Sequence, residues 1–181
     1  MKEYNKDMVV LVDSADQEIG IAPKLDAHRD NLLHRAISVF AYDSHGKWIL
    51  QKRAGTKYHS QNLWSNTCCS HPYPGEDLTN AASRRLKEEM SLGGNPKKVF
   101  DFLYQVDLEN DLSEHELDHV FIVKIDQQPI PNPEEVSDWR KISFEELVLE
   151  VKENPDQFSA WFKLIYARVQ EHIEKSENSM V

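Results

Sequence analysis

The sequence lacks several features that define specialised classes of protein. Only two cysteines occur among its 181 residues, Cys68 and Cys69, and because they are neighbours they do not form disulfides between distant segments. A run of about 18 apolar residues, the length of a membrane-spanning helix, is also missing, so we expect no membrane partner. Residues 1–7 lack the apolar stretch of a secretory signal, and a cytoplasmic protein is therefore expected.

Basic residues are scarce as well. The chain has 21 Lys and Arg against 31 Asp and Glu, which gives a formal net charge of -10. This excess of negative charge disfavours nucleic acid as a partner. An acidic protein still binds an anionic small molecule where a metal ion or a local group of basic side chains offsets its charge. The length and a hydrophobic content of 40% fit one medium-sized domain covering residues 1–181.

The pattern of apolar residues predicts strands and helices without a regular βαβ order. Strands are expected at residues 8–12, 36–42, 48–53, 100–108 and 116–125, with a short strand through the two cysteines. Helices are expected at residues 77–90, capped by Asp77 or Thr79, after Ser143, which forms a capping box with Glu146, and at about 159–174. Segment 23–33 is expected to be irregular with at most a short helix, and the tail 176–181 to be frayed. This order predicts an α+β fold, also described as a mixed-sheet α/β sandwich.

The most informative stretch, residues 64–72, reads Trp-Ser-Asn-Thr-Cys-Cys-Ser-His-Pro. It places a thiol, a hydroxyl and an imidazole within three positions. Cys69 and His71 are two residues apart, so in an extended segment their side chains point to the same side. Cys68 points to the opposite side, and we assign it to packing. A thiol beside a possible metal ligand indicates a place for proton-transfer chemistry.

Other residues have an ordinary interpretation beside a functional one. Three imidazoles and two nearby carboxylates suit a divalent first-row metal, although a single His is more often an ordinary surface or core residue; these are His28, His34, His71, Glu114 and Glu116. Ion pairs at i,i+4 spacing mark either a solvated helix face or a helix that binds magnesium and diphosphate, and these join Arg84 to Glu88 and Arg85 to Glu89. Surface charge or phosphate binding explains Lys24, Arg53 and Lys57. Core packing, or contact with a cation in a cavity, explains Tyr104 and Trp161.

Taken together and in this order, the residues resemble the type I isopentenyl diphosphate isomerases, which share a fold with the Nudix hydrolases. The resemblance extends over roughly residues 8–165 and is strongest at residues 64–72. It implies a Nudix-like fold and the isomerisation of isopentenyl diphosphate to dimethylallyl diphosphate in isoprenoid precursor synthesis. The implied route is protonation and deprotonation through a tertiary carbocation.

The same resemblance implies a role for each candidate residue. Glu116 with Tyr104 would deliver a proton, Cys69 as a thiolate would take one on the opposite face, and Trp161 would lie against the cation. One divalent ion, Mn²⁺, Mg²⁺ or Zn²⁺, would be held by His28, His34, His71, Glu114 and Glu116. Mg²⁺ bound with the diphosphate would be held by Glu89, helped by Lys24, Arg53, Lys57 and Arg85. The expected partner is a small-molecule diphosphate, and the protein itself is expected to be a monomer or weak homodimer.

Departures from the Nudix motif separate two alternative functions. Ser70 and Ser91 stand where that motif has glycine, and Arg85 stands where it has glutamate. Loss of that carboxylate weakens the multi-carboxylate metal site that a hydrolase needs to activate water. The sequence therefore favours an isomerase over a Nudix-type diphosphate hydrolase. A non-catalytic binding module on the same fold is the other alternative, and it predicts no coherent group of metal ligands.

Overall fold

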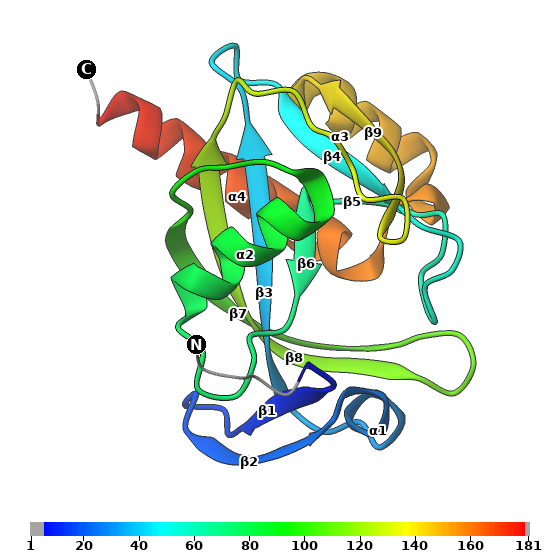
Figure 1. Ribbon diagram of the computed structural model, residues 1–181. Helices are drawn as coiled ribbons and strands as arrows, with labels where there is room; N and C mark the ends of the chain where they lie inside the picture. The colour runs from blue at the N-terminus through cyan, green and yellow to red at the C-terminus, as the bar shows by residue number, and fades with distance from the viewer. Residues whose placement is uncertain (1–5, 180–181) are drawn as a thin grey trace.

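The computed structural model describes residues 6–179, in which nine strands form one mixed sheet flanked by helices (Figure 1). The strands are β1 (Met8–Val12), β2 (Glu18–Pro23), β3 (His34–Tyr42), β4 (Trp48–Arg53), β5 (Trp64–Ser65), β6 (Cys68–Ser70), β7 (Lys97–Asp107), β8 (Ser113–Lys124) and β9 (Val136–Ile142). The helices are α1 (Lys24–Arg29), α2 (Leu78–Met90), α3 (Phe144–Glu153) and α4 (Ala160–Asn178), with a short 3₁₀ helix at Pro155–Gln157.

The sheet is covered on both faces, and alternation along β3 shows why. Phe40 and Tyr42 pack into a cluster with side chains of α3 and α4. Val39 and Ala41, one position away, pack into a second cluster with α2. Because successive side chains of a strand point to opposite faces, a nearly continuous apolar strand feeds two cores. Figure 1 shows the resulting layers, with α2 in front of the sheet and α4 behind it. The predicted α+β sandwich is confirmed.

β3 and β8 form the parallel centre of the sheet and determine which side chains meet. Their pairing runs from His34 beside Glu116 to Tyr42 beside Lys124. On the other side of β8, Tyr104 of β7 is the antiparallel partner of Glu116. On the other side of β3, β6 pairs antiparallel and places Cys69 beside Ser38. Backbone register alone therefore brings together residues that are as much as 82 positions apart in the sequence, as His34 and Glu116 are.

Local signals explain the ends of the helices. Asp77 is the N-cap of α2, where its carboxylate accepts a hydrogen bond from the Asn80 N–H at 3.0 Å. Ser91 follows the helix with a φ of 54°, in the left-handed region that glycine adopts at least cost, which explains the glycine in the Nudix motif. Ser143 and Glu146 form the predicted capping box at the start of α3.

Several elements differ from the prediction. β2, β5 and β9 were not predicted, whereas α1 is the short helix that the sequence allowed within residues 23–33. β8 begins at Ser113, so both Glu114 and Glu116 lie inside it. α4 continues to Asn178, and the predicted frayed tail otherwise falls on residues 180–181, outside the described part of the chain. Among the helices of residues 6–179, none has the length and apolarity needed to cross a membrane.

The buried hydroxyl of Thr67, just before β6, forms hydrogen bonds with β3 and β4, and its removal tests this part of the fold. Thr67 Oγ1 donates to the Ile49 carbonyl at 2.6 Å and accepts from the Ala41 N–H at 2.7 Å. In Thr67→Val both backbone groups lose their partner at nearly constant volume, so we expect a loss of about 1–3 kcal/mol in the free energy of unfolding, measured in urea. Thr56→Val, at an exposed threonine, is the control, and an equal loss in both variants would contradict the prediction.

Candidate active site

A cavity of about 490 Å³, counting the space open to solvent, is lined by residues of β3, β6 and β8, of the 54–63 loop and of α4. Ten of the residues predicted for the site line it, and these are Lys24, Arg53, Lys57, Cys69, His71, Arg85, Tyr104, Glu114, Glu116 and Trp161. The other three, His28, His34 and Glu89, are buried outside its lining. Residues chosen from motifs scattered over the sequence therefore surround one space.

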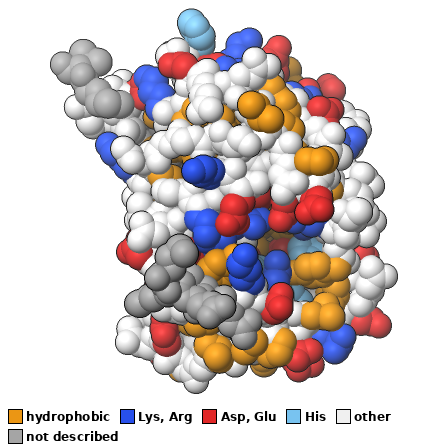
Figure 2. All heavy atoms as spheres, in the orientation of Figure 1, with side chains coloured by type: hydrophobic (Ala, Val, Ile, Leu, Met, Phe, Trp, Pro, Cys, Tyr) orange, Lys and Arg blue, Asp and Glu red, His pale blue; other side chains and the backbone are white. Residues whose placement is uncertain are grey.

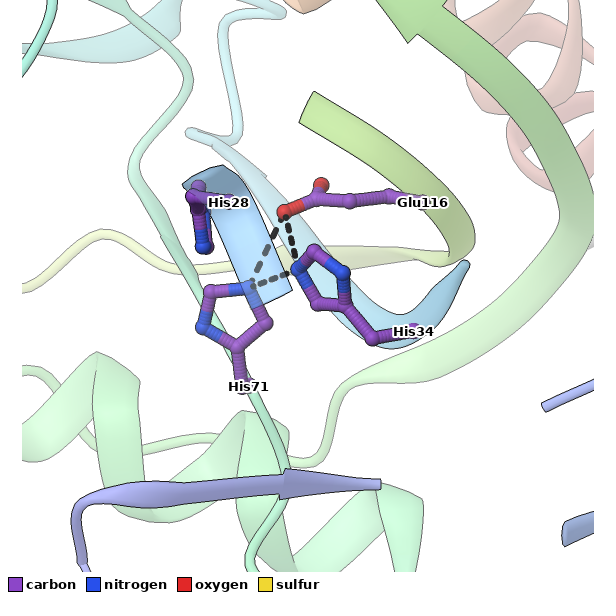
Figure 3. A group of neighbouring side chains, drawn as sticks. All are labelled: His28, His34, His71 and Glu116. Carbon is purple, nitrogen blue, oxygen red and sulfur yellow. Dashed lines mark hydrogen bonds and ion pairs between the residues drawn. The ribbon is translucent and has the colours of Figure 1, made fainter. Parts of the chain in front are cut away.

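Three histidines and a glutamate converge on one point beside this cavity (Figure 3). They come from four segments, because His28 lies on α1, His34 begins β3, His71 directly follows β6, and Glu116 lies in β8. One ligand atom from each lies within 4.8 Å of the others. Nε2 of His71 is 2.9 Å from Glu116 Oε1 and 3.2 Å from Nε2 of His34.

Backbone carbonyls orient two of the imidazole rings. Nδ1 of His28 lies 2.8 Å from the Lys24 carbonyl oxygen, and Nδ1 of His34 lies 2.7 Å from that of Leu32. A carbonyl only accepts, so each Nδ1 carries the proton and each Nε2 lone pair is directed at the convergence point. This tautomer is the one that metal-binding histidines adopt when the outer nitrogen is held by the protein.

The charge states also suit a cation. Burial lowers the pKa of His28 to about 4 and that of His71 well below its usual range, so both rings are neutral at pH 7. Burial opposes ionisation of Glu116, but its close contacts with His34 and His71 outweigh burial and hold the pKa of that carboxyl well below its usual range. Neutral imidazoles and an ionised carboxylate are the forms that bind a divalent metal. These four residues fit such an ion.

Tyr104 joins the two glutamates of β8. Its hydroxyl lies 2.6 Å from Glu116 Oε2 and 3.0 Å from Glu114 Oε2. Burial and the charges of both glutamates raise the pKa of Tyr104 well above its usual range, so it stays a proton donor. Burial and the neighbouring charge of Glu116 raise the pKa of Glu114. The two carboxyls, two residues apart on one face of the strand, therefore sit in opposite environments.

Cys69 and Cys68 lie on opposite faces of the sheet, as predicted. Cys68 is fully buried in the cluster beneath α2, whereas Cys69 is half-buried against the α4 cluster and lines the cavity. Burial raises the pKa of the Cys69 thiol to about 12, although the nearby charge of Arg53 opposes this. Nη1 of Arg53 lies 3.6 Å from the sulfur. The thiol is therefore protonated in this state.

A buried polar network fixes Trp161 in the cavity wall. Its indole N–H donates to Asn66 Oδ1 at 3.1 Å, and Asn66 Oδ1 also accepts from the Ser65 hydroxyl at 2.9 Å. Asn66 Nδ2 in turn donates to the Cys68 carbonyl oxygen at 2.6 Å, so the ring is tied to the cysteine strand. These bonds explain why Ser65 and Asn66 stand inside the 64–72 motif, since buried polar groups need partners.

Four basic side chains, Lys24, Arg53, Lys57 and Arg85, line the cavity, and Arg53 lies beside Cys69 and Trp161. Burial and the charges of the other three lower the pKa of Lys24 to about 8. Figure 2 shows Lys and Arg side chains gathered along a hollow of this face, with histidine visible inside it. An acidic protein thus has a local positive region, as expected from the sequence.

Three of these cations, Arg53, Lys57 and Arg85, already have partners within the chain. Lys57 forms an ion pair with Glu135, and Arg85 Nη2 lies 3.2 Å from the same carboxylate. Arg53 donates to the carbonyl oxygens of Ser60 at 3.0 Å and His59 at 3.2 Å, and its guanidinium lies 5.1 Å from the centre of the Trp161 ring. An incoming anion therefore meets cations that are held in place.

Comparison with known proteins identifies the family. The family model described as NUDIX domain matches residues 32–162. Isopentenyl-diphosphate Delta-isomerase 2 of Aromatoleum aromaticum is 47% identical over 164 residues, which cover 91% of this chain and 87% of that protein. The isopentenyl-diphosphate Delta-isomerase of Pectobacterium atrosepticum is 46% identical over 173 residues, which cover 94% of this chain and 97% of that one. The chain belongs to the isopentenyl-diphosphate Delta-isomerases, within the Nudix family.

Solved structures agree on the fold. A protein of Deinococcus radiodurans matches with a TM-score of 0.72 at 17% identity, covering 88% of this chain and 98% of its own. The MutT protein of Methanosarcina mazei matches with a TM-score of 0.63 at 14% identity, covering 79% of this chain and 96% of its own. At such low identity these matches show the Nudix fold alone, and they confirm the fold predicted from the sequence.

The carboxylates on and before the α2 helix of this isomerase-family chain are paired with arginines. Arg84 binds Glu76 at 2.7 Å, and Arg85 binds Glu89 at 2.8 Å and Glu88 at 2.9 Å. Each carboxylate of this group is thus paired with a guanidinium. Among residues 6–179, the groups able to hold a metal lie elsewhere, around His28. The predicted binding of Mg²⁺ by Glu89 stays a prediction.

His59 is a site residue that sequence reasoning missed. It lines the cavity, and with His28 and Glu114 it forms a second group whose ligand atoms lie within 4.8 Å of one another. Glu114, predicted as a ligand together with His34 and His71, falls in this group and not in theirs. His59 stands in a loop without periodicity, so only the adjacent basic residues Arg53 and Lys57 marked that segment.

The carboxylate of Glu135 gives a prediction about pH. Burial opposes its ionisation, but Lys57 and Arg85 together lower its pKa from 4.5 to about 2. A depressed carboxyl pKa stabilises the folded state above the ordinary pKa, and this stabilisation is lost as pH falls from about 4.5 toward 2. We expect Glu135→Gln to lower the free energy of unfolding at pH 7 by on the order of 1 kcal/mol, and by much less at pH 3.

Denaturant unfolding at both pH values measures this difference. Glu134→Gln is the matched control, because its side chain is exposed on the same turn. A Glu135→Gln deficit that is the same at pH 7 and pH 3 would show that the ion pairs are not its cause.

Proposed function

We propose that this chain interconverts isopentenyl diphosphate and dimethylallyl diphosphate in isoprenoid precursor synthesis, and that the cavity described above is its active site. Membership of the isopentenyl-diphosphate Delta-isomerases supports the activity. One observation carries the assignment of the site: Cys69 and the hydrogen-bonded pair of Glu116 and Tyr104 line the same cavity, whose basic end suits a diphosphate.

The basic end of the cavity positions the substrate. Lys24, Lys57 and Arg85 present ammonium and guanidinium groups at its entrance, where diphosphate oxygens accept charge-assisted hydrogen bonds. Arg53 contributes charge, but N–H groups on all three of its nitrogens already contact the chain, so we assign it a smaller part in gripping the diphosphate. Anchoring the anionic end leaves the hydrocarbon end to reach Cys69, Glu116 and Trp161.

His28, His34, His71 and Glu116 would hold a divalent metal, with Glu114 next to them. The bound metal would supply positive charge that tunes the acidity of the Glu116 carboxyl. The donor set of imidazoles and carboxylates admits Mn²⁺, Mg²⁺ or Zn²⁺, and a further Mg²⁺ would enter with the diphosphate.

Isomerisation requires one proton to be added to the terminal alkene carbon. Another proton is removed from the methylene on the other side of the tertiary carbon. Cys69 and Glu116 are proposed as the groups that make these transfers, with Tyr104 donating to the Glu116 carboxylate. They start in opposite protonation states, the thiol protonated and the carboxylate ionised, as one donor and one acceptor require. These starting states are the reverse of those expected from the sequence, where Cys69 was assigned as a thiolate.

Trp161 is proposed to stabilise the tertiary cation between the two transfers. Its ring is 2% exposed and lines the cavity, so a contact with the cation there is largely free of water. A desolvated cation–π contact is worth about 2 kcal/mol. Exclusion of water also protects the cation from capture.

Cytoplasmic location and a monomeric or weakly dimeric state stay predictions.

Incubation with isopentenyl diphosphate in heavy water tests the proposed activity. With Mg²⁺ and Mn²⁺ present, proton NMR should show dimethylallyl diphosphate that carries deuterium, because the added proton comes from exchangeable groups. Release of phosphate with no dimethylallyl product would instead support the Nudix hydrolase alternative.

The two adjacent cysteines supply a matched test of the site. Cys69→Ser should lose nearly all turnover, because a serine hydroxyl is a far weaker acid than a thiol. Cys68→Ser should keep most of its turnover and lose only stability, since this side chain is buried away from the cavity under α2. Initial rates are read by NMR on samples whose folding is checked by circular dichroism. An equal loss in both variants would contradict the assignment of Cys69.

A further inference from the structure

The side chain of His59 is buried in the cavity wall, as the predicted ligands His28 and His34 are buried beside it. It lies in the loop between β4 and β5, yet its side chain is only 4% exposed. Its ring stacks on that of His28, with centroids 5.5 Å apart and planes inclined by 29°. Its carbonyl oxygen accepts a hydrogen bond from Arg53, which fixes the backbone at this point. A buried polar ring held in this way needs a partner for its inner nitrogen.

The outer nitrogen of His59 has a hydrogen-bond partner. Nδ1 lies 3.2 Å from the Ser60 hydroxyl oxygen, and Nε2 lies 3.7 Å from Glu114 Oε1. The Ser60 hydroxyl can donate or accept here, and in the tautomer whose proton is on Nδ1 the Nε2 lone pair faces Glu114 and His28, as it does in the arrangement of His28 and His34.

The group of His28, His59 and Glu114 is not a site separate from that of His28, His34, His71 and Glu116. His28 belongs to both groups, and its Nδ1 is occupied by the Lys24 carbonyl. Only Nε2 remains as a donor, and one lone pair binds one ion. An ion bound at Nε2 of His28 would therefore lie next to both groups.

We propose that His59 is a further nitrogen donor of this centre, on its Glu114 side, and that it makes the centre prefer transition metals such as Zn²⁺ and Co²⁺ over Mg²⁺. Imidazole nitrogen favours the former ions, whereas Mg²⁺ favours oxygen ligands. This inference rests on the metal centre of the proposed function and adds a residue to it. It also addresses the choice among Mn²⁺, Mg²⁺ and Zn²⁺, which the other ligands leave open.

Metal binding to the full chain, stripped with a chelator, tests the proposal without reference to turnover. Co²⁺ is titrated while its visible absorption is followed, and Mg²⁺ is titrated by calorimetry. In His59→Gln the Co²⁺ affinity should fall by about 10- to 100-fold and the Co²⁺ absorption should shift, while the Mg²⁺ affinity stays unchanged. His59→Asn is measured in parallel, so that a folding defect in one variant does not decide the result.

Two further variants separate the possible failures. His45→Gln, in the exposed turn between β3 and β4, controls for the loss of any histidine and should bind both ions as the wild type does. His34→Gln should lose binding of both ions; if it does not, the proposed metal centre itself is wrong. If His34→Gln loses Co²⁺ binding while folded His59→Gln and His59→Asn keep wild-type affinity, this inference is overturned. An altered KM for the diphosphate in those variants would then indicate that His59 contacts the substrate and not the metal.

Discussion

The parallel pairing of β3 with β8 is the constraint on which the site depends. It places His34 beside Glu116, and the neighbouring antiparallel pairs place Tyr104 beside Glu116 and Cys69 beside Ser38. These positions are fixed by backbone hydrogen bonds inside a sheet that is covered on both faces, so they do not depend on flexible side chains. A slip of one residue in the β3–β8 register would turn the Glu114 and Glu116 side chains away from the cavity. The core that holds the register therefore also holds the chemistry.

Charge compensation is the second organising feature. Acidic groups at Glu76, on α2 and at Glu135 are matched by Arg84, Arg85 and Lys57, and Lys24 adds a further cation to the cavity lining. Deeper in the cavity, the neutral imidazole of His71 lies beside an ionised Glu116. Positive and negative regions thus lie in sequence along one cavity, although the chain as a whole is acidic. An anionic headgroup and a cationic intermediate can be stabilised by different ends of the same space.

The sequence predicted those features that depend on local spacing. Alternation separates Cys68 from Cys69 and aligns Glu114 with Glu116, and capping residues mark the starts of α2 and α3. What it missed depends on contacts that leave no periodic trace. β9 buries only the residues at its two ends, and most of β2 is exposed, so neither shows clear alternation. The direction of His59 is set by Arg53 and Ser60 within an irregular loop, and no pattern links it to Glu114.

The shared carboxylate of Glu135 has a consequence for selectivity. Because it already occupies Lys57 and Arg85, any incoming anion has to compete with an acceptor that is covalently part of the protein. A small singly charged anion offers these cations no more negative charge than the carboxylate of Glu135 does. A diphosphate brings more charge and more oxygen acceptors, and so it can displace the carboxylate. Glu135 is therefore a built-in competitor at these two cations, and it favours ligands that carry more than one negative charge.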